Sequence, residues 1–388
     1  MSRRRFRVEL SPRGQFLALS LMARRDPTWS SKVRRLYDAV GEEALLAAAE
    51  RNQVTTFVAH ALVTAEVPRV PEHWSERRRH NYERVRSLLD SAKMACECLE
   101  RAGCQPTVIE AAGTLLGTDL PFESFASRDV DILVAPETWT EVHGVMTSLG
   151  FRLRKRRPGR TNRAEYVREA TGGVPHWLEI GSEAFERHWM PVDVSDRTAI
   201  WLERREPSRK DDALFVLANT DALVQASIHT SMHGYVRAPG LRLYVDIDRA
   251  AHDGAPSWSA VVAEARACRA QLRCLTAFAL ASAVLETPVD EPALEALGAT
   301  EAPWQRVRKL LESESLVLEE GVQELGRSKA LLLDALLSDD GAWSWIRTVL
   351  FPEHAWLAAR FGQPGQREGN ASLQWRRLVE LTSSWRPQ

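Results

Sequence analysis

The sequence predicts an α+β protein in which a small mixed β-sheet lies between predominantly helical N- and C-terminal regions. Three observations support this prediction. Apolar residues recur every three or four positions in three early segments, which indicates amphipathic helices: 14–24, 31–65 and 74–103. From Thr107, short apolar segments separated by glycine- or proline-containing turns are typical of strands. Helical spacing returns after about residue 210.

Local signals place the boundaries. The last early helix ends at Gly103, a residue that readily adopts the backbone conformation of a helix C-cap. Strands are expected in "TVIEA", "DVDILVA", "FRLRKR", "AEYVRE" and "HWLEIG", and a helix in "GTLLGTDLPF" that breaks at Pro121. The segment "GQPGQREGNAS" (362–372) is typical of a linker. We therefore expect a helical region at 1–103, an α+β core at 104–205 and a helical domain at 206–388.

Composition excludes several classes of protein. With 388 residues, 44% hydrophobic and 27% charged, the chain is neither disordered nor fibrous. The formal charge of -1 provides no overall field toward nucleic acid or an anionic membrane, so neither is an expected partner. No apolar run has the length of a secretory signal or a membrane helix. The five cysteines lack metal-site spacing, which favours free thiols and a cytoplasmic location.

Two aspartates stand out in the segment "SRDVDILVAP" (127–136). Side chains at i and i+2 of a strand share a face, so Asp129 and Asp131 are expected to lie close together. At about 4 Å and an effective dielectric near 20, two carboxylates repel by about 4 kcal/mol. A bound divalent cation would remove this repulsion. Asp129 capping a turn after Ser127 is the alternative, but it leaves Asp131 unexplained.

A third acid, Glu179, lies in the later strand "HWLEIG". If Leu178 and Ile180 face the core, Glu179 emerges on the opposite face, where the aspartates also lie if Val130 is buried. Three carboxylates suit Mg²⁺, which binds through a few carboxylates and the phosphates of a nucleoside triphosphate. A strand residue that faces solvent or an arginine is the open alternative for Glu179.

At this point the chain resembles the nucleotidyltransferase superfamily, and within it the bacterial "uncharacterised nucleotidyltransferase" group. The resemblance rests on an ordered series of segments over residues 15 to 300: "VIEAAGTLL", "SRDVDILV", "FRLRKRRPGR", "HWLEIG" and "ALVQASIHTSMHGYVRAPGLRLYVDIDRAA". Many relatives have a lysine where this chain has Ala112, and a histidine where it has Gly181.

The resemblance implies a role for each matching residue. Asp129 and Asp131 would bind Mg²⁺, with room for two ions, and Glu179 would complete the metal site or act as the base on the acceptor hydroxyl. Backbone amides at Gly113 and Thr114 would hold the triphosphate at a helix N-terminus, as such termini generally can. Arg128 would contact a phosphate oxygen. Gly113 could instead serve only a tight turn.

Three other patterns carry weaker signals. His229 and His233 have the four-residue spacing of a zinc pair, but without a third ligand a packed pair lining the cleft is favoured. Asp246 and Asp248 repeat the aspartate spacing in a helical stretch, where they do not share a face, and Asp246 is expected to hold Arg242. The basic run at 152–160 is typical of a solvated face, with binding of an acidic acceptor or the triphosphate as the alternative.

Together, the residues and the resemblance predict a Mg²⁺-dependent transferase that moves a nucleoside monophosphate from a triphosphate such as ATP to an acceptor. The acceptor would be a small molecule or a peptide or protein, in specialised-metabolite or modified-peptide biosynthesis. The alternative is a non-catalytic nucleotide-binding or scaffold protein that keeps the fold, which the departures at Ala112 and Gly181 support.

Overall fold

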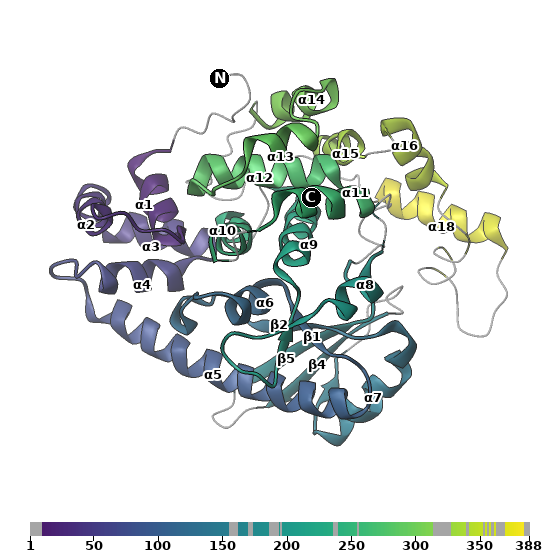
Figure 1. Cartoon of the computed structure of the whole chain (residues 1–388), viewed down its shortest axis with the longest axis horizontal. Helices are drawn as coiled ribbons and strands as arrows, with labels where there is room; N and C mark the ends of the chain where they lie inside the picture. Colours follow the sequence, from purple (N-terminus) through teal and green to yellow (C-terminus); the bar gives the residue numbers. More distant parts are fainter. Residues whose placement is uncertain are drawn as a thin grey trace.

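The computed structural model describes residues 10–154, 162–169, 174–185, 194, 196–235, 240–253, 256–312, 327–338, 341–351, 354, 357, 361 and 369–383. Within these residues a seven-stranded mixed sheet lies among helices, so the predicted α+β class is confirmed (Figure 1). Helices α1 to α4 lie to one side of the sheet, α5 runs below it, and the helices from α8 onward lie above it (Figure 1).

Five helices precede the sheet: α1 (Pro12–Leu21), α2 (Trp29–Val40), α3 (Glu42–Arg51), α4 (Thr55–Thr64) and α5 (Glu72–Arg101). The continuous periodicity of 31–65 is therefore divided into three helices. One break is at Gly41, whose φ of 78° ends α2, and the other is the turn at 52–54 between α3 and α4. Gly103, also at φ 78°, follows α5 and confirms the predicted C-terminal glycine.

The sheet has the strand order β3-β4-β5-β2-β1-β7-β6. β2 pairs with β5 and β1 with β7 in parallel, and the other neighbours are antiparallel. The strands are β1 (Thr107–Ile109), β2 (Asp129–Leu133), β3 (Arg152–Leu153), β4 (Arg163–Glu169), β5 (Pro175–Gly181), β6 (Glu206–Pro207) and β7 (Phe215–Val216). The sequence did not predict β6 and β7, which lie beyond the expected core boundary at residue 205.

The two faces of the sheet have different partners. α5 packs against β2 and β5, and His176 of β5 hydrogen-bonds to Ser87 and Ser91 of α5. The side chains that share this face are buried: Val130, Ile132, Leu178 and Ile180. On the opposite side, α6 (Glu110–Gly117) packs against β1, β2, β7 and α9 (Asn219–Met232). Residues that alternate with the buried set therefore face α6 and α9.

The remaining described helices complete the fold: α7 (Trp139–Ser148), α8 (Thr198–Glu203), α10 (Leu243–Asp253), α11 (Trp258–Ala267), α12 (Gln271–Leu285), α13 (Glu291–Ala296), α14 (Ala302–Glu312), α15 (Arg327–Leu336), α16 (Ala342–Leu350) and α18 (Asn370–Ser383). One apolar core runs from Phe16 in α1 through the sheet to Leu337. Most of the linker predicted at 362–372 lies outside the described residues, and its last residues begin α18.

None of the helices in the described part of the chain is long and apolar enough to cross a membrane. All five cysteines are free thiols, as the sequence predicted.

Candidate functional site

Three acidic residues from β2 and β5 share the face that looks toward α6. In the parallel ladder Asp131 lies opposite Glu179, and Asp129 lies opposite Trp177. Val130 and Leu178, which alternate with them, are almost fully buried on the other face. The predicted common face of the three acids is therefore present. Ser127 donates a hydrogen bond to Asp129 Oδ1 at 2.5 Å, so the serine of the predicted turn orients the first aspartate.

Arg163 of β4 lies among these acids. Its Nε is 3.0 Å from Glu179 Oε1, and one terminal nitrogen is 3.7 Å from Asp131 Oδ1. The same nitrogen is 3.6 Å from Glu110 Oε1. One guanidinium thus balances three carboxylates from three elements, and each of these side chains is less than a fifth exposed.

The space for Arg163 depends on Gly181, its partner in the β4–β5 ladder. A Cβ at Gly181 would lie 3.1 Å from Arg163 Nε, closer than almost all real Cβ contacts. A histidine at this position, as in many relatives, would therefore compete with Arg163 for the same space. Sequence reasoning noted Gly181 but did not connect it with Arg163, which is 18 residues earlier and distant in any local pattern.

Glu110 is a fourth acid, which sequence reasoning missed. It is the first residue of α6, directly after β1, and its φ of 57° is in the left-handed region, which is strained for a residue with a side chain. Its Oε1 lies 3.2 Å from Nδ1 of His229 on α9. The strand-to-helix turn at Glu110 thus directs a carboxylate toward both Arg163 and His229. The sequence pattern "TVIEA" placed it in a strand and gave no signal for this role.

The charges in the cluster perturb one another. Burial and the neighbouring charges of Glu110, Asp129 and Glu179 raise the pKa of Asp131 well above its usual value, although Arg163 opposes them. Burial also acts to raise the pKa of Glu110, but His229 and Arg163 outweigh it and lower this pKa to about 2. Burial disfavours charged His229, yet the Glu110 carboxylate raises its pKa. The aspartate pair therefore carries more negative charge than Arg163 alone offsets.

Gly113 and Thr114 lie on α6 beside the acids, and both have structural contacts. A Cβ at Gly113 would be only 2.8 Å from the Val108 carbonyl oxygen, so glycine lets α6 approach β1 closely. The hydroxyl of Thr114 hydrogen-bonds to Asp246 of α10. Burial raises the pKa of Asp246 to about 6, although the hydrogen bond from Thr114 acts to lower it. Since α6 begins at Glu110, its free first-turn amides belong to residues 110–112.

A cavity of about 740 Å³ opens beside Asp129. Three arginines line it: Arg77 of α5, Arg128 just before β2 and Arg242 just before α10. One comes from each of the expected regions 1–103, 104–205 and 206–388. The uncapped start of α4 at Thr55 and Thr56 also lines it. Its volume is in the range of cavities that hold nucleotide-sized ligands, about 300–1,000 Å³.

The weaker motifs have structural contacts. His229 and His233 stack with ring centroids 4.8 Å apart, which agrees with the packed pair that the spacing favoured. Asp246 faces Arg242 and Thr114, whereas Asp248 bonds to Thr287 and to the Ala23 amide, so the two aspartates do not share a face. Arg154 stacks over Trp177, and residues 155–160 of the basic run lie outside the described residues.

The acids suit a hard divalent cation in donor type and in shared orientation, and burial and the neighbouring carboxylates raise the pKa of Asp131. As the side chains stand, however, no three histidine, cysteine or acidic residues of the described chain gather closely enough to bind a metal. Arg163 lies in the space between Asp131 and Glu179. A cation held by both of these acids would compete with this guanidinium for their oxygen atoms.

The sheet presents paired carboxylates beside a strand–helix turn, which is the arrangement that the resemblance to nucleotidyltransferases led us to expect. The family model described as "Uncharacterised nucleotidyltransferase" matches residues 38–286, and the chain belongs to this family. The match covers the four acids, Arg163, His229 and the arginines of the large cavity. No curated protein matches the chain, and no solved structure does.

Proposed function

We propose that the protein transfers a nucleoside monophosphate from a nucleoside triphosphate to an acceptor in a Mg²⁺-dependent reaction. The observation that supports this most is the register of β2 and β5, which sets Asp131 and Glu179 side by side on the face toward α6. Asp129 and Asp131 would hold the cation, with Glu179 as a third ligand or as the base. The cation would supply charge neutralisation of the phosphates.

The triphosphate fits the cavity of about 740 Å³, because Asp129 and three arginines line it. Arg128 and Arg242 would bind phosphate oxygens. The acceptor hydroxyl attacks the α-phosphorus as its proton passes to a carboxylate. The bond from that phosphorus to the bridging oxygen breaks, and pyrophosphate leaves.

A non-catalytic nucleotide-binding protein is the second candidate, and Arg163 favours it. A guanidinium among the carboxylates offsets part of their charge without any metal, and Gly181 provides its space. Such a protein would bind nucleotide through the arginine-lined cavity and release no pyrophosphate.

One experiment tests the two functions. The purified protein is incubated with Mg²⁺ and each α-labelled triphosphate, with and without cell extract, and pyrophosphate and labelled products are measured. The transferase predicts pyrophosphate release with label on an acceptor, and loss of both in Asp129→Asn/Asp131→Asn. Nucleotide binding without pyrophosphate under every condition would contradict the transferase and support the non-catalytic protein.

A further inference from the structure

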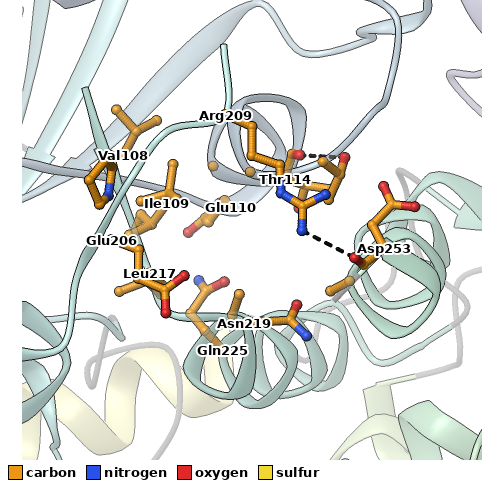
Figure 2. A pocket seen from close by; sticks show the side chains of 17 residues that line it. Val108, Ile109, Glu110, Thr114, Glu206, Arg209, Leu217, Asn219, Gln225 and Asp253 are labelled. Atoms are coloured by element: carbon orange, nitrogen blue, oxygen red, sulfur yellow. Dashed lines mark hydrogen bonds between the residues drawn. The ribbon is translucent and has the colours of Figure 1, made fainter. Parts of the chain in front are cut away.

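A second cavity, of about 70 Å³, lies between α6, α9 and the β6–β7 edge of the sheet (Figure 2). It shares no lining residue with the large cavity beside Asp129. Glu110 lines it, and the same carboxylate lies 3.6 Å from Arg163 of the acidic cluster. The small cavity therefore borders the acidic cluster at Glu110, through residues other than those of the arginine-lined cavity.

Two amide side chains of α9 face this cavity with unsatisfied donors. Gln225 is only 2% exposed, and its Nε2 is buried without a hydrogen-bond partner among the described residues. Nδ2 of Asn219 is likewise buried without a hydrogen-bond partner among the described residues. Figure 2 shows Gln225 projecting from α9 into the cavity, with Glu110 and Arg209 across from it. A buried donor that has lost water requires an acceptor, so the cavity is built to receive an oxygen atom.

The charged groups around the cavity restrict what that oxygen can belong to. Three acids line it, Glu110, Glu206 and Asp253, against one cation, Arg209. Arg209 donates a hydrogen bond to the backbone carbonyl oxygen of Asp253 at 3.1 Å, so one of its N–H groups is already used. Arg163 and His229 offset the charge of Glu110, but Glu206 and Asp253 still outnumber Arg209. An anion would face this excess of carboxylates at close range. A neutral or cationic group that both accepts and donates hydrogen bonds is complementary to it.

The size of the cavity sets a further limit. About 70 Å³ is roughly half the volume of an engineered protein cavity that holds benzene, about 150 Å³. It admits the end of a slender molecule and excludes a nucleobase or a sugar ring.

We propose that this cavity anchors a hydroxyl-bearing end of the acceptor, and that the acceptor is a small polyol or amino alcohol. Another hydroxyl of the same molecule then lies beyond Glu110, at the acidic cluster where the α-phosphorus is attacked. The inference rests on the proposed nucleotidyl transfer. It selects the small-molecule acceptor over the peptide or protein acceptor.

Three two-carbon probes that differ in charge test the proposal: ethanolamine, ethylene glycol and glycolate. Their binding to the full chain is measured by ligand-observed NMR. We expect ethanolamine and ethylene glycol to bind and glycolate to bind at least about tenfold more weakly, because it meets three carboxylates. Gln225→Met, which keeps the side-chain volume, should weaken binding of the first two probes about tenfold or more by removing the buried amide.

Gln305→Met, an exposed glutamine of α14, is the matched control and should bind the probes like the parent. Glycolate as the best probe, no probe binding to the parent, or equal loss in both variants would overturn the proposal. Binding of Mg²⁺ and ATP is measured on the same samples. Probe binding without nucleotide binding would overturn the proposed transfer while leaving the cavity as a site for small polyols and amino alcohols.

Discussion

Arg163 contacts Glu179, Asp131 and Glu110, and it shares the last of these carboxylates with His229, which lies nearer to it. Its side chain is 12% exposed, so water screens these contacts only weakly. In the proposed reaction a cation held by Asp131 and Glu179 would compete with it for their oxygen atoms. Arg163 therefore stabilises the metal-free protein and competes with metal binding.

Arg163→Gln should accordingly destabilise the metal-free protein by about 3 kcal/mol, the low end for removing one partner from a buried ion pair. Adding Mg²⁺ should recover more stability in the variant than in the parent, because the cation replaces the missing charge. Urea unfolding with EDTA and with Mg²⁺ measures both effects. An identical Mg²⁺ response in the two proteins would show that the acids do not bind the ion.

The Glu110–His229 pair should contribute stability in a defined pH range. His229 has a raised pKa, so its contribution is complete below its ordinary value of 6.5 and is lost as the pH rises through the raised value. Glu110 has a pKa lowered to about 2, so its contribution is complete above 4.5 and is lost as the pH falls through about 2. Both groups are charged between these limits.

A double-mutant cycle of Glu110→Gln and His229→Gln, in metal-free buffer, should therefore give a coupling of about 1–3 kcal/mol at pH 5.5 and clearly less at pH 9. The measurement is urea unfolding of the four proteins at each pH. Equal coupling at both pH values would show that the contact is not between charged groups.

Glu179 is the acid with the most open role. As a base or third ligand it should be dispensable for nucleotide binding, so Glu179→Gln should keep triphosphate affinity while transfer falls by about 10²-fold or more. Equilibrium binding and initial rates on the same preparation separate the two effects. Unchanged rates would remove Glu179 from the reaction and leave it as a partner of Arg163.

Some of these residues were predictable and others were not. Strand alternation predicted the common face of Asp131 and Glu179, because a period of two is a local property. Glu110 was missed because its position depends on a left-handed turn that the pattern "TVIEA" does not signal. The contacts of Arg163 and His229 depend on pairing between distant segments, which no spacing in a single sequence reveals.

At the scale of elements, α6 is positioned by the close approach of Gly113 to β1. Gly113→Ala would place a Cβ 2.8 Å from the Val108 carbonyl oxygen, and backbone atoms cannot easily shift. We expect a loss of about 1–3 kcal/mol in unfolding free energy together with weaker nucleotide binding, as α6 moves.

Gly144→Ala in α7 is the control for this change. A Cβ there meets nothing within 4 Å, so alanine should be neutral or stabilise the helix by up to about 1 kcal/mol. Thermal and urea unfolding compare the two variants. Equal effects at both positions would show that the α6–β1 contact does not determine the position of the site.

Elements were predicted where their patterns were long. β4 and β5 have seven residues each and were recognised, and the short β1 and β3 were recognised within longer strand-like segments. β6 and β7 have two residues each and no such segment around them. The segment 31–65 kept helical spacing across two breaks, so the pattern indicated helix throughout and only Gly41 marked a division.

At the scale of the whole molecule, one apolar core joins the N-terminal helices, the sheet and the helices up to α15. Trp345 of α16 belongs to a separate small cluster with Ala335, and Trp343 is 79% exposed. The residues of the proposed site and of its two cavities all lie between 50 and 253. The last helices thus contribute little to the site.

A chain that ends at residue 338 should therefore bind nucleotide within about twofold of the parent, since distant sites act independently. Its melting temperature should fall by no more than about 2 °C, the shift for roughly 1–2 kcal/mol at about 2.1 cal/mol/K per residue. Differential scanning fluorimetry and nucleotide titration measure both. Loss of nucleotide binding would place the C-terminal helices in the function.

The most direct test of the central claim is a crystal structure of the protein with Mn²⁺ and a non-hydrolysable nucleoside triphosphate. Mn²⁺ shares the oxygen ligands of Mg²⁺ and is located by its anomalous signal. The account predicts Mn²⁺ bound by Asp129 and Asp131, Arg163 displaced from between Asp131 and Glu179, and the triphosphate among the arginines beside Asp129. Nucleotide bound with Arg163 still between those acids, and no Mn²⁺ on the aspartates, would contradict it.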